Sequence, residues 1–98
     1  MIDQLSAAIS RRLVLTIDYD PGVRHVEPHA LGIGTDGQIL LRAFQTDGAS
    51  GSGEHINWKL LRVDRLRSMQ PSGGVFTTPR PGYRRGDSAM TRGIIAQL

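Results

Sequence analysis

The stretch Leu13-Val14-Leu15-Thr16-Ile17-Asp18-Tyr19 decides the fold class, because large apolar residues recur at every second position along it. Successive side chains of a β-strand point to opposite faces, so this pattern predicts a strand with one buried face. Asp20-Pro21-Gly22 follows immediately. Proline fixes φ and glycine accepts positive φ, which is typical of a tight turn. The sequence therefore predicts a strand that turns back into a second one.

The same reasoning extends downstream to four further strands. They are predicted over 23–33, over 38–44, around Ile56, Trp58 and Leu60, and over 63–69. Pro28 is expected to interrupt the second strand or to place it at an edge. Thr35-Asp36-Gly37 predicts a hairpin turn, and the glycine- and serine-rich segment 47–54 a flexible loop. The side chains expected inside the fold are Leu15, Ile17, Ile39, Leu41 and Leu60.

Helical spacing of apolar residues occurs at the two ends of the chain. Ile2, Leu5, Ala8 and Ile9 predict a short N-terminal helix, which is expected to pack across one open end of the strands. Near the C-terminus, Asp87 is a candidate N-cap for a helix carrying Met90, Ile94, Ile95 and Leu98, although Gly93 would cost that helix about 1 kcal/mol. The predicted class is mainly β with flanking helices: a small, strongly bent, five-stranded antiparallel barrel.

Length and composition exclude several classes of protein. Ninety-eight residues suffice for one compact domain, and the absence of cysteine excludes disulfides, thiolate metal sites and a cysteine nucleophile. No apolar run is long enough to span a membrane, and no basic stretch followed by an apolar segment opens the chain. We therefore expect a cytoplasmic protein without membrane association.

The charge is divided unevenly along the chain. Eleven of the twelve basic residues are arginine, the exception being Lys59. Residues 1–56 contain four arginines against seven acidic residues, a net charge of −3, whereas residues 57–98 contain eight basic residues against two acidic ones, a net charge of +6. A GC-rich genome raises arginine content everywhere but does not segregate charge between halves. An anionic partner is therefore predicted.

Three patterns resemble chemical sites without the context that those sites need. Gly32-Ile33-Gly34-Thr35-Asp36-Gly37 spells a dinucleotide fingerprint, but a strand pattern follows it instead of a helix, so a strand–turn–strand is predicted. His25, Glu27 and His29 share one face of a regular strand, where exposed polar alternation explains them better than a metal site. No pair of carboxylates and no serine elbow indicates catalysis. We expect no enzyme activity, no metal and no cofactor.

Two arginine clusters are candidates for anion binding. Arg62, Arg65 and Arg67 lie close together around Asp64, and either bind phosphates or form a surface ion pair with that aspartate. The segment Pro79–Gly86 contains Arg84 and Arg85 next to Pro-Gly-Tyr. It is either an additional nucleic-acid contact or a basic connector that tethers the last helix.

The chain also resembles the WYL domain, a ligand-sensing module of bacterial transcriptional regulators and some defence systems. The resemblance covers residues 5 to about 70 and rests on the order and spacing of five short motifs: Leu5-x-x-Ala8-Ile9-x-x-Arg12, Leu15-x-Ile17-x-Tyr19, Arg24-x-Val26-x-Pro28-x-x-Leu31, Ile39-Leu40-Leu41-x-Ala43-Phe44 and Leu61-Arg62-Val63-Asp64-Arg65-Leu66. Ile39 and Leu40 stand where the family usually has Trp-Tyr, which puts the identity of the ligand in doubt.

The resemblance implies an Sm-like (Src-homology-3-type) barrel with a basic pocket that binds nucleic acid, often single-stranded, or another negatively charged effector. It implies a domain over residues 1–70, leaving 71–98 as a basic connector and a terminal helix that packs on the barrel or on a partner subunit. Carried over by position, the ligand-binding residues are Tyr19, Arg24, Arg42, Arg62 and Arg65, with Arg84 and Arg85 as possible additional contacts.

Two functions follow from this reading. The first is a non-catalytic regulatory module that binds single-stranded nucleic acid or a phosphate-rich effector, with binding lost in Arg62→Ala with Arg65→Ala or, if the tail is the site, in Arg84→Ala with Arg85→Ala. The second is a module for self-association or for docking to a partner regulatory protein, with vestigial ligand binding. A homodimer is predicted, because exposed edge strands and the apolar side of the terminal helix both need covering.

Overall fold

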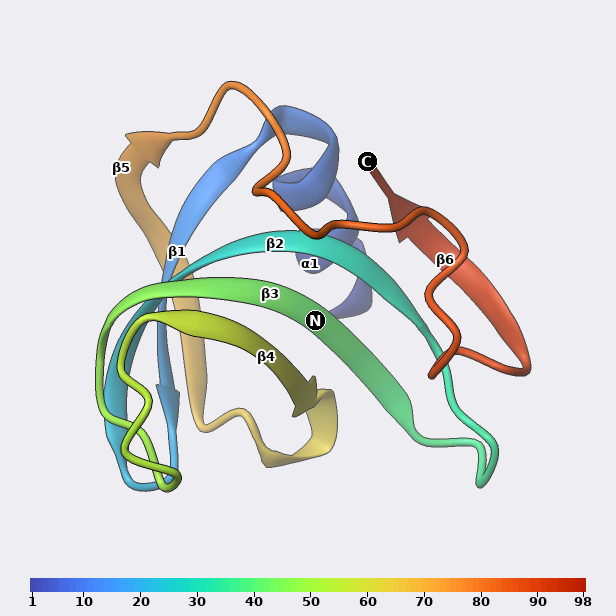
Figure 1. The fold of residues 1–98 in the computed structure, drawn as a ribbon, viewed down its shortest axis with the longest axis horizontal. Helices are drawn as coiled ribbons and strands as arrows, with labels where there is room; N and C mark the ends of the chain where they lie inside the picture. The colour runs from blue at the N-terminus through green and yellow to red at the C-terminus, as the bar shows by residue number, and fades with distance from the viewer.

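The alternation in the first strand organises a single antiparallel sheet (Figure 1). The computed structural model describes residues 1–98. Its elements, in chain order, are α1 (Ile2–Arg11), β1 (Leu13–Tyr19), β2 (Gly22–Ile33), β3 (Ile39–Gly48), β4 (Asn57–Arg62), the 3-10 turn η1 (Val63–Arg65), β5 (Ser68–Val75) and β6 (Gly93–Gln97). The predicted mainly-β class and the N-terminal helix are confirmed.

The strands lie in the order β4-β3-β2-β1-β5, and β6 pairs with β2 beside this path. Every pairing is antiparallel. The outermost strands β4 and β5 do not pair with each other, so the sheet stays open and does not show the closed barrel that was predicted. The chain forms six strands where five were expected.

β2 is the strand that joins the parts of the sheet. It pairs with β3 along most of its length, while its other edge pairs first with β1, up to Val26, and then with β6, from Ala30 onward. Pro28 lies in the gap between these two partners. Proline has no N–H to donate, so an interrupted edge is where a strand tolerates it. The pairing with β3 also shifts register between Pro28 and Ala30, so the prediction that Pro28 interrupts this strand is confirmed on both edges.

The inner face of the sheet carries the main core. Leu15, Ile17 and Leu41 are fully buried there, as predicted, and Ile39 packs at the margin. The remaining core side chains come from both the sheet and α1: Leu5, Ala8, Ile9, Val26, Leu31, Ala43, Leu61 and Val63. The helix contributes one apolar side to this core, because Leu5, Ala8 and Ile9 recur at helical spacing.

One core prediction is wrong. Leu60 is 41% exposed, whereas its neighbour Leu61 is only 3% exposed. Leu61 pairs with the core residue Leu41, so the two share the inner face, and the alternating Trp58 and Leu60 point to the outer face. Two adjacent leucines make both registers apolar, and the sequence alone does not decide between them.

The predicted C-terminal helix is also wrong. Residues 76–92, which we call the strap, cross the outer face of the sheet in turns and irregular structure, and the chain then enters β6. Gly93 has φ of 135°, a conformation that only glycine adopts readily, and Ile94 and Ile95 are β-branched. The spacing of Met90, Ile94, Ile95 and Leu98 suits a helix, but pairing with β2 overrides it.

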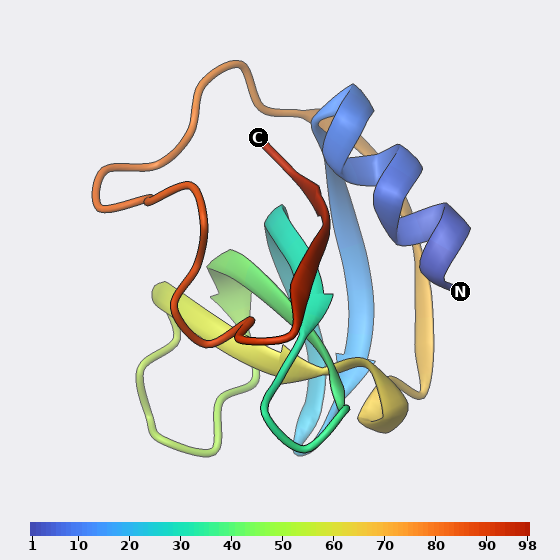
Figure 2. The same ribbon diagram turned by 90° about the vertical axis from the view of Figure 1, so that its right-hand side faces the viewer.

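Figure 2 shows the strap and α1 on opposite sides of the sheet. Met90 of the strap is buried against Ala30 and Leu40, which forms a second, smaller core on the outer face. The terminal segment 71–98 is thus continuous with the sheet at both ends, since β5 runs from Ser68 to Val75 and β6 pairs with β2. The chain has no helix with the length and apolar character needed to cross a membrane.

The two adjacent leucines of β4 offer a matched test of the register. We expect Leu61→Ala to lower the free energy of unfolding by about 2–5 kcal/mol, because it leaves a cavity in the core. Leu60→Ala removes an exposed side chain and should change it by less than about 1 kcal/mol. Urea denaturation of both variants measures the difference. Equal losses, or a larger loss for Leu60→Ala, would contradict this register.

Candidate functional site

Most of the aromatic residues gather on the outer face, beneath and along the strap. Phe44 and Trp58 come from β3 and β4, and the strap adds Phe76 and Tyr83. Three of these rings surround the imidazole of His29, whose centroid lies 4.7 Å from that of Trp58, 5.2 Å from that of Phe76 and 5.2 Å from that of Tyr83. Trp58 also meets Phe44 edge to face at 5.5 Å. Such aromatic pairs stabilise by about 0.5–1.5 kcal/mol beyond the area they bury.

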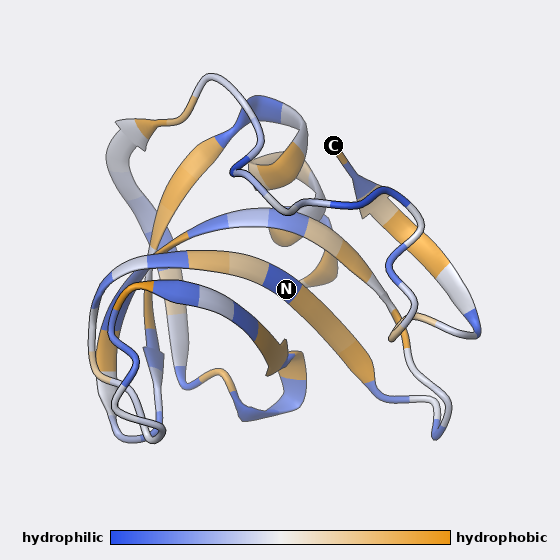
Figure 3. Cartoon of the chain, in the orientation of Figure 1, coloured by the Kyte–Doolittle hydropathy of each residue, from blue (hydrophilic) through white to orange (hydrophobic).

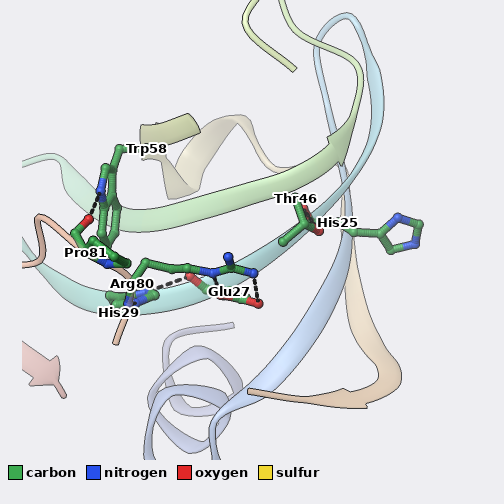
Figure 4. Close-up of polar contacts among 7 residues, drawn as sticks. All are labelled: His25, Glu27, His29, Thr46, Trp58, Arg80 and Pro81. Carbon is green, nitrogen blue, oxygen red and sulfur yellow. Dashed lines mark hydrogen bonds and ion pairs between the residues drawn. The ribbon is translucent and has the colours of Figure 1, made fainter. Parts of the chain in front are cut away.

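Arg80 fastens the strap to β2 (Figure 4). Its guanidinium donates to both carboxylate oxygens of Glu27, from Nε at 2.7 Å and from Nη2 at 3.0 Å, and it lies 4.7 Å above the Phe44 ring. Its backbone N–H donates to Nε2 of His29 at 3.1 Å. The hydrogen bond to Glu27 raises the pKa of Arg80, so the guanidinium stays charged. The Glu27 side chain is only 7% exposed, and Arg80 neutralises a charge that would otherwise be buried alone.

The strap then turns over the indole of Trp58. The indole Nε1–H donates to the carbonyl oxygen of Pro81 at 3.1 Å. Gly82 follows with φ of 92°, and a Cβ there would lie 3.2 Å from the Trp58 nitrogen. Glycine thus supplies both the conformation and the close approach. Tyr83 comes next and stacks against Trp58 at 26°, with the ring centroids 6.3 Å apart.

A second ion pair anchors the far end of the strap. Arg42 of β3 donates to Asp87 from Nε at 2.6 Å and from Nη2 at 3.3 Å. The hydrogen bond from Arg42 holds the pKa of the Asp87 carboxyl below its usual range, and the backbone N–H of Ala89 also donates to it. Asp87 therefore fixes a strap residue against the sheet and does not cap a helix.

Between these two anchors lies an open pocket of about 480 Å³. The Trp58 indole and Tyr83 line one part of it, and the rest is formed by Arg42, Gly82, Arg84, Arg85, Gly86, Asp87 and Ser88. Arg84 is exposed and forms no ion pair. Arg85 is exposed and donates only to the backbone oxygen of Leu98. The pocket thus combines two half-buried aromatic rings with two guanidinium groups that pair with no aspartate or glutamate.

The residues implied by the family resemblance lie elsewhere, except for Arg42. Tyr19, Arg24 and Arg62 are neighbours: the Arg24 guanidinium lies 5.0 Å from the Tyr19 ring, and the Arg62 backbone N–H donates to the Tyr19 hydroxyl. Arg24 is only 4% exposed and donates to backbone oxygens and to Gln45, and its burial lowers its pKa. Arg62 forms a two-bond ion pair with Asp64. Neither guanidinium is free for a ligand.

Arg65 is exposed on η1 without a partner, so it and Arg62 do not form a joint cluster of free cations. Arg67, the third arginine of that segment, pairs with Asp18 of β1 and lowers the pKa of that carboxyl through the hydrogen bond. Surface pairing, the simpler of the two readings, therefore accounts for most of this basic cluster. Arg84 and Arg85, predicted only as additional contacts, lie on the pocket instead.

The other two sequence patterns do not form chemical sites either, but the exposure expected for His25, Glu27 and His29 is wrong for two of them. Glu27 and His29 are buried, because the strap covers them and Arg80 pairs with both. His25 points away from Glu27 and His29 and bonds to Asp47 at 2.5 Å, so these three side chains do not converge (Figure 4). In the glycine pattern, Gly34 and Gly37 lie at the turn between β2 and β3, where the Gly37 N–H donates to the Gly34 oxygen. This is the predicted strand–turn–strand.

Sequence reasoning missed the partners of the strap. Figure 3 shows why: the strap is hydrophilic along most of its length and resembles a connector. The one available signal was Pro81-Gly82-Tyr83, a turn followed by an aromatic residue between arginines. Nothing in the sequence links this turn to Trp58 or Glu27. No family model matches the chain, and no curated protein or solved structure matches it either.

The two arginine–carboxylate pairs, one buried and one exposed, give a test of how the strap is held. We expect Glu27→Gln to lower the free energy of unfolding by about 1.5–3 kcal/mol, because the buried amide accepts only one of the two hydrogen bonds that Arg80 donates and turns its NH₂ group toward the other. Asp64→Asn removes a comparable but exposed bidentate pair and should cost less than about 1 kcal/mol. Chemical denaturation measures both. A Glu27→Gln protein as stable as Asp64→Asn would show that Arg80 does not secure the strap.

Proposed function

We propose that the protein is a non-catalytic module that binds single-stranded nucleic acid in the pocket between Trp58 and Tyr83. The observation that supports this most is the combination of the half-buried rings of Trp58 and Tyr83 with the adjacent cations Arg84 and Arg85, which pair with no aspartate or glutamate. Aromatic side chains stack on bases of any sequence, and arginine binds the phosphates between them. Binding of this kind is sequence-tolerant and sensitive to salt.

The size and chemistry of the pocket support a short contact. A volume of about 480 Å³ is within the usual range for small-molecule sites and suits one or two nucleotides. Arg42 adds a third guanidinium to the wall, but Asp87 neutralises it. We therefore assign two phosphate contacts to this site, one to Arg84 and one to Arg85.

We also propose that the fold is related to the Sm-like barrel of WYL domains. In support, five consecutive antiparallel strands, with η1 between β4 and β5, follow an N-terminal helix. The position of the family's Trp-Tyr signature is occupied by Ile39, at the margin of the inner core, and Leu40, in the outer one. Aromatic rings for a ligand would come from Trp58 and Tyr83 instead.

Fluorescence anisotropy with a labelled oligothymidylate tests the binding proposal. For two phosphate contacts on a single strand, affinity should fall roughly sevenfold when salt rises from about 50 to about 200 mM. Arg84→Ala with Arg85→Ala should abolish both the binding and its dependence on salt. The matched control is Arg62→Ala with Arg65→Ala, which removes the same charge elsewhere and should leave the isotherm unchanged.

Three outcomes of this experiment would overturn or redirect the proposal. If the wild-type protein does not bind at low salt, or if only the control pair reduces binding, the pocket is not the site. If inorganic polyphosphate competes as well as an oligonucleotide with the same number of phosphates, the bases contribute nothing and the ligand is a phosphate-rich effector.

Self-association is a second candidate function, and β6 supports it. This strand pairs only with β2, so its other edge has unpaired backbone groups, and Ile94 and Ile95 on it are 36% and 38% exposed. If the protein forms a dimer through this edge, the mass from light scattering should rise to twice the monomer value with concentration. Ile95→Lys should keep the protein monomeric, whereas Val23→Lys, at another exposed apolar side chain, should not. A mass that stays monomeric at all concentrations would exclude this function.

A further inference from the structure

The most deeply buried titratable group of the protein holds the strap in place. His29 lies at the irregularity of β2, between Pro28 and Ala30, and its side chain is fully buried. Rings from β4 and from the strap enclose it, those of Trp58, Phe76 and Tyr83. Because His29 has no exposed surface, both ring nitrogens depend on protein partners for their hydrogen bonds.

Those partners fix the protonation state of the ring. The backbone N–H of Arg80 can only donate, so Nε2 of His29 must carry the lone pair that accepts it at 3.1 Å. The proton of the neutral ring is then on Nδ1, where it donates to the carbonyl oxygen of Glu27 at 2.8 Å. A second proton on Nε2 would point at the Arg80 N–H. The imidazolium is therefore incompatible with the docked strap.

The charged groups around His29 do not compensate for this conflict. From β2, the Glu27 carboxylate would favour an imidazolium, but both of its oxygens bind Arg80. From the strap, the Arg80 guanidinium opposes a second positive charge, and Tyr83 is neutral because burial raises the pKa of its phenol. Trp58 and Phe76 have no charge. In agreement with this arrangement, burial lowers the pKa of His29.

We infer that His29 is a proton-sensitive latch that regulates the pocket: the neutral ring holds the strap on the sheet, and protonation releases it. Trp58 belongs to the sheet, whereas Tyr83, Arg84 and Arg85 belong to the strap, so release separates Trp58 from Tyr83 and from the cations. That consequence for the ligand rests on the proposed function. The latch itself does not.

The direction of the pH dependence follows from proton linkage. In the released strap the ring has its ordinary pKa of about 6.5, and in the docked strap the pKa is lower. The released state therefore binds more protons in the interval between the two values, and docking weakens as pH falls through it. Below about pH 6.5, docking should lose up to about tenfold in its equilibrium constant for each pH unit. Above it, docking is independent of this proton.

Amide hydrogen exchange without any ligand tests the latch, because the Arg80 N–H is the donor to His29. The protection factors of the Arg80 amide and of its strap neighbours should fall up to about tenfold for each pH unit below about pH 6.5. The protection factors of the β3 amides should stay high. Imidazole ¹⁵N shifts should report the tautomer with its proton on Nδ1. Trp58, the single tryptophan, gives a parallel fluorescence readout of the same release.

Two variants separate the latch from other effects of pH. His29→Gln presents an amide that does not titrate, so protection of the strap should lose its pH dependence even though the protein is less stable. His25→Gln removes an exposed histidine paired with Asp47 and should leave the pH dependence unchanged. If His29→Gln does not fold, the wild-type titration decides. A His29 that titrates without loss of Arg80 protection, or that carries its proton on Nε2, overturns the inference.

Oligonucleotide affinity at about pH 7.5 and about pH 5.5 then connects the latch to the pocket. We expect the affinity of the wild-type protein and of His25→Gln to fall at the lower pH, and that of His29→Gln to change little. Absence of binding at the higher pH would refute the proposed function and leave the exchange result standing. Binding with a strap whose protection is independent of pH would refute the latch alone.

Discussion

The docking of Arg80 on β2 is the interaction on which the outer face depends. Burying the Glu27 carboxylate and the His29 imidazole on a strand leaves two polar groups that an apolar cover cannot satisfy. Arg80 satisfies both, through its guanidinium and its own backbone N–H. Because removing Arg80 leaves Glu27 and His29 buried and unpaired, the cost of losing this contact exceeds its net contribution to stability. The polar residues of β2 therefore determine where the strap docks as much as its apolar residues do.

This dependence makes the pocket a product of tertiary structure. One wall is the sheet residue Trp58, and the other is a strap with little regular secondary structure, fastened mainly by Arg80, Pro81, Asp87 and Met90. A segment attached at a few polar points opens at lower free energy than the strands beneath it. The two layers are therefore stabilised differently. The inner core is apolar and includes residues of α1, whereas the outer layer is held by a few polar contacts, each of which can be broken by one protonation or one substitution.

Local patterns predicted the inner layer well and the outer layer poorly. Strict alternation placed β1, and turn residues placed the β2–β3 hairpin, because both depend on neighbours in the chain. The strap depends on pairs such as Glu27 and Arg80, which are 53 residues apart, and no single-sequence pattern reports them. At the C-terminus, the apolar spacing fitted a helix, but residues 93–97 form a strand because they pair with β2. In β4, adjacent leucines satisfied both registers, so burial was decided by the pairing with β3.

The uneven charge of the two halves finds part of its explanation inside the fold. Two of the five ion pairs join an acidic residue of the N-terminal half to an arginine of the C-terminal half, namely Arg67–Asp18 and Arg80–Glu27, whereas Arg42–Asp87 joins the halves in the opposite sense. These two pairs hold the strap and the segment before β5 against the first strands, so part of the surplus charge is neutralised within the fold. The excess of arginine by itself is weak evidence for an anionic ligand. The stronger evidence is the position of two arginines that pair with no aspartate or glutamate. Arg84 and Arg85 lie on a pocket lined by aromatic rings, where phosphate and base can be bound together.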